Sequence, residues 1–215
     1  MHYTSILFDL DGTLLDTLGD LTAAMNRTLT RHGLPERTRQ QMRTALGNGA
    51  RRLMELSVPS GTDSALFETL LAEYNADYAA HCRIETAPYP GVAALLRTLR
   101  TQGRKLAIVS NKPDEAVRTL RADFFADAVQ IAVGETAAIR RKPAPDMLLA
   151  AMEQLGADPD KTVFVGDSEV DIATARAADL PCISVLWGFR DRDVLEHAGA
   201  QQFAADIAQL QALLG

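Results

Sequence analysis

Residues 5–14 read SILFDLDGTL, an apolar run that ends in two aspartates and a glycine. A short apolar run closed by an Asp-Gly pair is typical of a buried strand with an exposed tip. Parallel sheets bind ligands at the carboxyl ends of their strands, where Asp9 and Asp11 would lie. Two charges this close repel by about 4 kcal/mol at roughly 4 Å and an effective dielectric constant of about 20, so a cation is expected beside them. The alternative is a surface turn, in which Asp-Gly pairs are common.

Composition restricts the class of protein. The 215 residues are 47% hydrophobic, enough for one domain or for a domain with a smaller one inserted. A net charge of −6 without long basic runs gives no electrostatic basis for binding nucleic acid. No apolar stretch suits a membrane span and no signal region precedes the first strand, so we expect no membrane partner and a cytoplasmic location. Cys82 and Cys182 show no pattern of a disulfide framework or zinc site.

Helical patterns fill the chain from Asp16 to about His81. Apolar residues recur there at helical spacing, and no strand pattern is found. A Pro-rich turn at residues 87–91 then stops the helices. Residues 16–85 are therefore predicted to be a helical insert within a domain made of residues 1–15 and 86–215. The four expected helices are Thr17–Arg31, Thr38–Leu46, Ala50–Leu56 and Asp63–Ala80.

Strand and helix patterns alternate from Pro90 onward. This alternation predicts an α/β fold with a doubly wound, Rossmann-like parallel sheet. Right-handed crossovers would bring the carboxyl ends of all strands to one edge. The expected strands are Ile6–Phe8, Leu106–Val109, Val129–Val133, Val163–Val165 and Ile183–Leu186. The expected helices are Val92–Arg100, Asp114–Leu120, Asp146–Leu155 and Ser168–Ala177, followed by a last strand and helix within Gln202–Leu214.

Polar residues gather at that predicted edge. Ser110 and Asn111 follow one strand, Asp167 follows another with Asp171 four residues later, and Lys142 lies in a Pro-rich turn. Carboxylates suit Mg²⁺, whereas an ammonium, a hydroxyl and the N–H groups of the turn after the first strand suit phosphate. Taken singly, Ser110 and Asp167 are better explained as helix caps, and Lys142 as a surface charge. Their joint occurrence at one edge favours a site for Mg²⁺ and phosphate.

Four motifs together resemble the haloacid dehalogenase-like phosphohydrolase superfamily, and within it the phosphoglycolate phosphatases. They stand, in the order of the family, at Asp9–Thr13, Ser110–Lys112, Lys142–Asp146 and Gly166–Asp171. The resemblance implies a Mg²⁺-dependent phosphatase, monomeric or homodimeric, that cleaves a small phosphorylated metabolite, 2-phosphoglycolate, through an aspartyl phosphate. The chain departs from the pattern at Asp179, where relatives usually carry glycine; a left-handed conformation there would reduce stability.

The resemblance also implies roles for individual residues. Asp9 would attack phosphorus, Asp11 would serve as general acid and then as base, and Lys142 would complete the catalytic set by neutralising charge. The implied phosphate-binding residues are Ser110, Asn111, Gly12 and Lys142. The implied Mg²⁺ ligands are the side chains of Asp9 and Asp167 and the backbone carbonyl of Asp11. The implied supporting residues are Asp171 and Thr13.

The helical insert resembles the small cap domain of this group, which would close over the substrate. Asn48, Gly49 and Arg51 are the candidate substrate contacts, because an arginine near the site would pair with the carboxylate of 2-phosphoglycolate. Alternatively, Gly47–Gly49 is only a turn between helices and Arg51 only coats its helix.

Three other functions remain open at the level of sequence. A sugar-phosphate mutase or a pyrophosphatase of the same superfamily would use the same core. A receiver-like signalling module, from a different class, also combines an aspartyl phosphate with lysine, hydroxyl and Mg²⁺, but it keeps its acidic pair and its phosphorylated aspartate on different strands.

Overall fold

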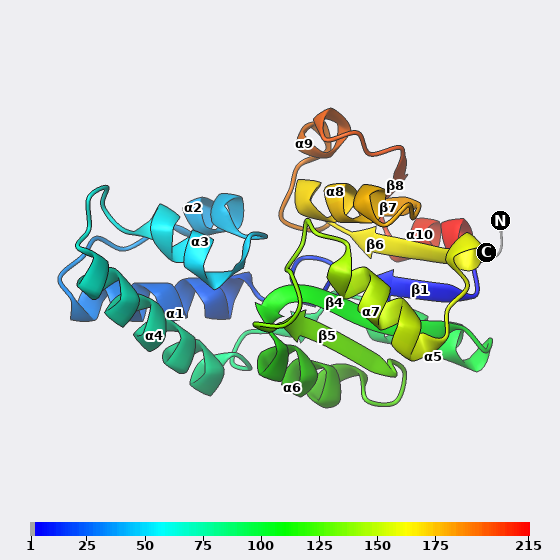
Figure 1. Cartoon of the computed structure of the whole chain (residues 1–215), viewed down its shortest axis with the longest axis horizontal. Coiled ribbons are helices and arrows are strands. Elements are labelled where there is room, and N and C mark those ends of the chain that lie inside the picture. Colours follow the sequence, from blue (N-terminus) through cyan, green and yellow to red (C-terminus); the bar gives the residue numbers. More distant parts are fainter. Residues whose placement is uncertain (1–2) are drawn as a thin grey trace. The chain divides into compact units, whose positions relative to one another are not determined.

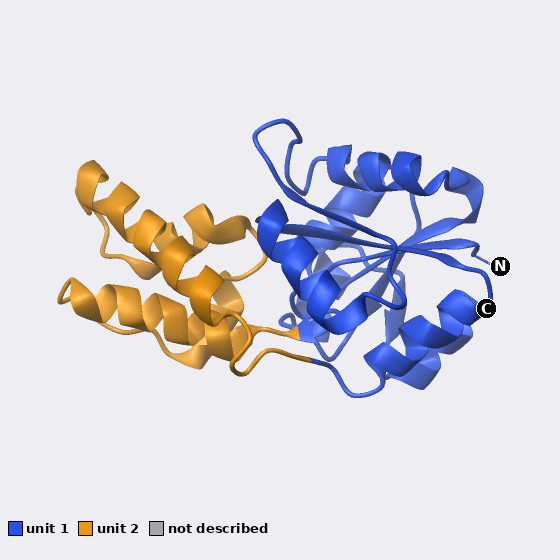
Figure 2. Cartoon of the chain, turned by 90° about the horizontal axis from the view of Figure 1, so that it is seen from below, with its two compact units in different colours: residues 1–15, 88–215 blue, residues 16–87 orange. Residues whose placement is uncertain are grey.

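The chain consists of two compact units. The computed structural model describes residues 3–215. Unit 1 is made of residues 1–15 and 88–215, and unit 2 of residues 16–87 (Figure 2). The insert begins at residue 16, as expected from the sequence, and ends at residue 87, two residues after the expected boundary.

Unit 1 is built on a six-stranded sheet whose strands run parallel in the order β5-β4-β1-β6-β7-β8 (Figure 1). β1 lies between β4 and β6, and its residues Ile6, Leu7 and Phe8 are fully buried. The predicted Rossmann-like α/β class is confirmed. The strands are β1 (Ser5–Phe8), β4 (Lys105–Pro113), β5 (Ile131–Glu135), β6 (Thr162–Gly166), β7 (Cys182–Val185) and β8 (Gln202–Ala204).

Helices cover both faces of this sheet (Figure 2). α7 and α8 share a core with the sheet in which Leu7, Met147 and Phe164 are fully buried, and α5 contacts α6 and α10. The helices of unit 1 are α5 (Val92–Thr101), α6 (Asp114–Phe125), α7 (Asp146–Leu155), α8 (Glu169–Ala177), α9 (Arg192–His197) and α10 (Ile207–Leu214), with a 3₁₀ turn at Pro159–Lys161.

Several elements of unit 1 differ from the sequence-based expectation; α6, for example, ends at Phe125 rather than at Leu120. β5 begins at Ile131 rather than Val129, because the N–H of Val129 is bonded to the carbonyl of Phe125 at the end of α6. β4 continues through Ser110 to Pro113, past a shift in its pairing with β5. α9 was not expected at all, since six residues with one buried side chain carry too little periodicity to detect.

Unit 2 contains four helices: α1 (Leu18–Arg31), α2 (Arg39–Ala45), α3 (Gly49–Ser57) and α4 (Ser64–His81). α1 packs against α2 and α4, and α3 packs against the same two helices. The buried side chains of Met25, Leu29 and Leu70 belong to this helical core. Among residues 3–215, no helix is long and apolar enough to cross a membrane.

The two segments that link the units pair as a short two-stranded sheet, β2 (Leu15–Asp16) with β3 (Ala87–Pro88). The residues just before β3 are tied to the first turn of α1. There the buried carboxylate of Asp20 accepts the N–H groups of Ile84, Glu85 and Thr86 at 2.9–3.0 Å. One carboxylate therefore fixes the return segment to the start of the insert.

Candidate active site

Lys142 lies at the centre of the polar cluster at the carboxyl edge of the sheet. Its ammonium donates to Asp9 Oδ1 and to Asp171 Oδ1, both at 2.7 Å. The lysine side chain is 3% exposed, Asp171 is fully buried and Asp9 is 10% exposed, so these ion pairs are shielded from water. The residue that follows β1, the turn before α7 and the first turn of α8 thus meet at one point.

Asp167 is held on both of its carboxylate oxygens. The Thr13 hydroxyl donates to Oδ1 at 3.2 Å, and the Phe189 N–H donates to Oδ2 at 2.7 Å. The indole N–H of Trp187 reaches back to the carbonyl of Thr13 at 3.0 Å. The loop after β7 therefore belongs to the site. None of the site residues predicted from the sequence lies in this loop.

Glycine is required at two positions around this carboxylate. A Cβ atom on Gly12 would lie 2.3 Å from Asp167 Oδ2, and one on Gly188 would lie 2.4 Å from the same oxygen. Gly12 also adopts φ +84°, which favours glycine. The sequence predicts Gly12 as a donor to phosphate, but its N–H is bonded to the carbonyl of Leu15 at 2.9 Å. Gly12 therefore supplies space for Asp167, and its donation to phosphate stays a prediction.

Asp171 is positioned by a capping box at the start of α8. Its Oδ2 accepts the Ser168 hydroxyl at 2.6 Å and the N–H groups of Asp167 and Ser168 at 3.2 and 3.1 Å. The Ser168 hydroxyl accepts the Asp171 N–H in return. With Oδ2 committed to the helix end, Oδ1 is left to orient Lys142.

β4 contributes side chains from successive residues. Asn111 bonds with both ends of its amide to the backbone of Lys142, and so supports the lysine. The Ser110 oxygen accepts the Lys112 N–H at 3.3 Å, which leaves its own O–H to donate to a phosphoryl oxygen. Asn111 is thus placed as a support for Lys142, and its contact with phosphate stays a prediction.

Lys112 was missed as a site residue by the sequence analysis. Its ammonium lies 3.1 Å from Asp11 Oδ2, and its side chain is 5% exposed against 20% for Asp11. The lysine stands inside the second motif, but spacing alone does not tell which residue of the Ser-Asn-Lys triplet reaches the first motif. The site therefore has two buried ammonium groups, each beside one aspartate of the Asp-x-Asp pair.

Burial and crowding shift the protonation of this cluster. Burial, reinforced by the charge of Asp171, raises the pKa of Asp9 well above its usual range. Burial also raises the pKa of Asp167 to about 7, with Asp171 adding to the shift and the Phe189 N–H opposing it. Burial alone would lower the pKa of Lys142, but the charges of Asp171 and Asp9 raise it instead, so the lysine stays protonated.

The carboxylates fit a hard divalent cation. Oxygens of Asp9, Asp167 and Asp171 lie within 4.8 Å of one another, and Lys142 is the ammonium bonded to two of these three buried groups. Mg²⁺ prefers such hard oxygen donors and needs only one or two carboxylates from the protein. Asp9 and Asp167 are the predicted side-chain ligands. The predicted contribution of Asp11 is its backbone carbonyl, so its side chain is not expected in this cluster.

The predicted substrate contacts of unit 2 lie at the turn between α2 and α3. Asn48 is the N-cap of α3 without a side-chain capping bond, and Gly49 begins that helix. The guanidinium of Arg51 is bonded to both oxygens of Glu68 at 2.9 and 2.8 Å and lies 5.3 Å from the ring centre of Phe67. Within unit 2, Arg51 therefore holds α3 to α4.

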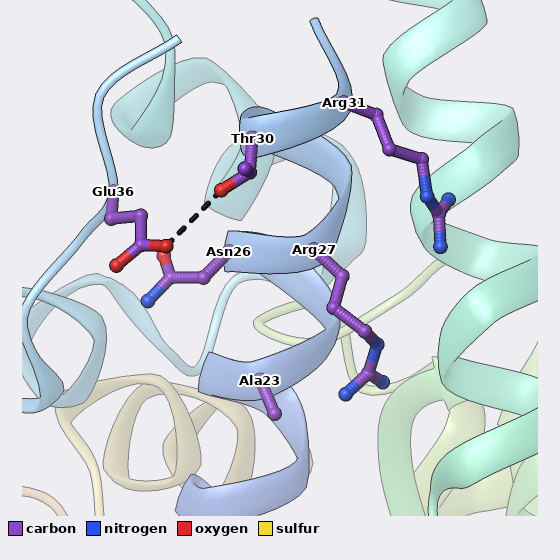
Figure 3. A pocket seen from close by; sticks show the side chains of 6 residues that line it. All are labelled: Ala23, Asn26, Arg27, Thr30, Arg31 and Glu36. Carbon is purple, nitrogen blue, oxygen red and sulfur yellow. Dashed lines mark hydrogen bonds between the residues drawn. The ribbon is translucent and has the colours of Figure 1, made fainter. Parts of the chain in front are cut away.

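Unit 2 also carries a hollow of about 440 Å³ beside α1 (Figure 3). The side chains of Arg27 and Arg31 point away from Glu36 in this view, and both bond to Asp77 at 2.5 and 2.6 Å. Glu36 accepts the Thr30 hydroxyl at 3.1 Å on the other side. The charged side chains around the hollow therefore form bonds within unit 2, which stabilise the packing of its helices. Its lining residues are Ala23, Asn26, Arg27, Thr30, Arg31 and Glu36.

Several known proteins are similar to this chain. A phosphoglycolate phosphatase from Pseudomonas putida is 34% identical over 97% of this chain and 78% of the relative. An N-acetylmuramic acid 6-phosphate phosphatase from Pseudomonas aeruginosa is 33% identical over 93% of this chain and 89% of the relative. A protein from Lactobacillus delbrueckii subsp. bulgaricus, whose crystal structure is known, is 36% identical in sequence to this chain. Its structure superposes with a TM-score of 0.94 and covers 100% of this chain and 99% of that protein.

The model of a protein family matches as well. It is described as haloacid dehalogenase-like hydrolase, and it matches residues 6–185, from β1 to the end of β7. These findings do not favour a mutase, a pyrophosphatase or a receiver-like module. The match spans all four motifs gathered at the sheet edge, and the chain belongs to the haloacid dehalogenase-like hydrolase family.

Proposed function

We propose that this chain is a Mg²⁺-dependent phosphatase that hydrolyses 2-phosphoglycolate through a phosphorylated Asp9. The observation that carries the proposal is the ammonium of Lys142, bonded at 2.7 Å to both Asp9 and Asp171 in a buried site. A nucleophilic carboxylate attacking a phosphate dianion needs positive charge beside it, and this lysine supplies part of it.

The first half of the proposed reaction uses the two aspartates that follow β1. An oxygen of Asp9 forms a bond to phosphorus as the bond from phosphorus to the leaving oxygen breaks. Asp11 gives its proton to that leaving oxygen, so glycolate departs as an alcohol. Lys142 and the Ser110 hydroxyl hold the phosphoryl oxygens during the transfer.

The second half restores the enzyme. Asp11, now a carboxylate, takes a proton from a water molecule, and the water oxygen forms a bond to phosphorus. The bond between Asp9 and phosphorus breaks, which releases inorganic phosphate and leaves Asp11 protonated for the next cycle. Asp171 takes no direct part; it fixes the ammonium of Lys142 beside Asp9 through its 2.7 Å bond.

Asp9, Asp167 and the carbonyl of Asp11 are the proposed Mg²⁺ ligands. When bound there, Mg²⁺ would neutralise charge on the phosphoryl group and on the nucleophile. Thr13 and the Phe189 N–H hold the Asp167 carboxylate at 3.2 and 2.7 Å, in a fixed orientation for this role.

The assignment of the substrate is based on the activities of similar proteins. The phosphoglycolate phosphatase of Pseudomonas putida is 34% identical to this chain, and the N-acetylmuramic acid 6-phosphate phosphatase of Pseudomonas aeruginosa is 33% identical. We propose that the helical insert, residues 16–85, acts as a cap and that Asn48, Gly49 and Arg51 contribute to substrate choice. A cytoplasmic location and a monomeric or homodimeric state stay predictions.

The decisive experiment measures release of inorganic phosphate from a panel with and without Mg²⁺. The panel contains 2-phosphoglycolate, N-acetylmuramic acid 6-phosphate, pyrophosphate and a hexose phosphate. We expect the highest kcat/KM for 2-phosphoglycolate and no turnover after chelation. If only N-acetylmuramic acid 6-phosphate were hydrolysed, that compound would replace 2-phosphoglycolate as the assigned substrate. If no ester released phosphate, the proposed phosphatase function would be overturned.

A further inference from the structure

The two buried lysines of the site have different surroundings. Lys142 is fixed between two carboxylates, at 2.7 Å from each. Lys112 lies 3.1 Å from Asp11, whose side chain keeps 20% of its surface exposed. Lys142 thus stands beside the attacking oxygen, whereas Lys112 stands beside the residue that we assign to the leaving oxygen.

This position places a cation next to the leaving group. To give up its proton, the Asp11 carboxyl has to approach the leaving oxygen within hydrogen-bond distance. An ammonium in contact with the same carboxyl then lies next to whatever the leaving oxygen carries. In 2-phosphoglycolate, a single CH₂ group separates that oxygen from a carboxylate.

The strand itself directs Lys112 to this place. Asn111 bonds to the backbone of Lys142 at 2.8 and 3.0 Å, and the Lys112 N–H bonds to the Ser110 oxygen at 3.3 Å. The end of β4 is therefore held by the two residues that precede Lys112, and the lysine side chain is 5% exposed. A cation fixed this way loses little conformational entropy when it binds an anion.

We propose that Lys112 binds the substrate carboxylate and selects phosphate esters whose leaving oxygen lies one carbon from a carboxylate group. The inference rests on the proposed phosphatase function and deepens it by naming the substrate class. It assigns the recognition of the carboxylate to unit 1 and does not require Arg51, which is bonded to Glu68.

The kinetic test compares two esters that differ only in the carboxylate. 2-Phosphoglycolate and ethyl phosphate are assayed with the wild type and with the Lys112→Met, Lys112→Arg and Lys161→Met variants. Lys112→Met should lower kcat/KM for 2-phosphoglycolate by about 10- to 100-fold more than for ethyl phosphate, as expected for one hydrogen bond between charged groups. Lys112→Arg should restore part of the difference. Lys161, exposed and paired with Asp158 at 3.5 Å, is the matched control and should change neither ester.

A binding measurement separates this inference from the proposed function. Calorimetry with Mg²⁺ present compares 3-phosphonopropionate, a non-hydrolysable mimic of 2-phosphoglycolate, with propylphosphonate, which lacks the carboxylate. Lys112→Met should weaken the binding of 3-phosphonopropionate by a factor similar to the loss in kcat/KM, and should leave the binding of propylphosphonate unchanged. If the wild type releases no phosphate from any ester, the phosphatase proposal fails and the calorimetry alone decides the role of Lys112. Equal losses for both ligands would overturn the inference while leaving the phosphatase function intact.

Discussion

The side chain of Asn111 and the backbone of Lys142 bind each other through two reciprocal hydrogen bonds. The Asn111 amide donates to the Lys142 carbonyl at 3.0 Å, and its oxygen accepts the Lys142 N–H at 2.8 Å. The same arrangement occurs in unit 2, where Asn26 and the backbone of Arg37 bond at 2.9 and 2.8 Å. Only the first of these pairs positions a proposed catalytic residue.

Asn111→Ala should therefore reduce activity as well as stability. We expect the free energy of unfolding to fall by about 1–3 kcal/mol, because buried backbone groups lose their partners. The value of kcat should fall by at least about tenfold, since the ammonium of Lys142 loses its fixed place. Asn26→Ala should lower stability while leaving kcat nearly unchanged. Urea denaturation and steady-state assays on both variants check this, and an equal loss of kcat in both would contradict it.

Asp9→Asn should abolish turnover, because an amide cannot form the proposed phosphoryl-enzyme. Asp11→Asn should lower the rate by about 10²- to 10⁴-fold through loss of general acid–base catalysis. Binding of inorganic phosphate should survive in the Asp11 variant. Phosphate release and isothermal titration with phosphate measure both effects. A near-normal rate in either variant would refute the roles assigned to this pair.

Removal of Mg²⁺ should inactivate the enzyme and lower its thermal midpoint. A ligand that binds only the folded state stabilises it in proportion to the logarithm of its concentration, so added Mg²⁺ should raise the midpoint progressively. Asp167→Asn should lose this response, because Asp167 is a proposed ligand. Asp160→Asn, at an exposed position before β6, is the control. If the thermal midpoint of the wild type did not change with Mg²⁺ concentration, the proposed metal site would be contradicted.

Unit 2 should lose stability in acid through Asp77. Burial alone would raise the pKa of Asp77, but hydrogen bonds from Arg27 and Arg31 lower it on balance. Because the pKa is lower in the folded state than in the unfolded state, the contribution of Asp77 is present above the unfolded pKa of about 3.9. It is lost as the pH falls through the folded value.

Asp77→Asn should therefore show a flatter decline in the free energy of unfolding below about pH 5 than the wild type. Urea titrations at several pH values measure the slope. Asp127→Asn should keep the wild-type slope, because Asp127 is 61% exposed and 3.8 Å from Arg97. Identical slopes for all three proteins would rule out the role of Asp77.

Asp179 is, among residues 3–215, the residue other than glycine with a positive φ, at 54°. Asp179→Gly should relieve this strain and raise the free energy of unfolding by up to about 1 kcal/mol. Asp158→Gly should do the opposite, since Asp158 has φ −82° and its side chain caps the turn before β6. Denaturation midpoints of the two variants should move in opposite directions; a loss of stability in both would disprove the strain.

The sheet and most helices could be predicted because their signals are local. The run Ile6–Phe8 is apolar throughout and is fully buried in the centre of the sheet. Ser168 is an N-cap residue by type, and it caps α8. The extension of β4 to Pro113 depends on the approach of Gly134, whose N–H bonds to Asp114 at 2.9 Å, and such a tertiary contact leaves no periodic signal.

The site was harder to predict where neighbours in the sequence divide their tasks. Residue spacing places Ser110, Asn111 and Lys112 at one strand end, but which of them supports Lys142 and which reaches Asp11 is decided by backbone direction. In the same way, the turn at Gly12 was expected to offer its N–H, and that group is used within the turn. The hydrogen bond from the Phe189 N–H to Asp167 joins residues that are far apart in the sequence. It forms because the loop after β7 approaches Asp167 in the folded sheet, which residue spacing does not predict.

The pairing of β2 with β3 has an evolutionary consequence. Since the chain leaves and re-enters the sheet-bearing unit through two adjacent segments, everything between them is topologically a loop closed at its base. Recombination could exchange that loop for another of different length without altering the path of any strand in the six-stranded sheet. The unit that holds the proposed catalytic residues and the helical insert can then diversify independently, as two separately inherited modules.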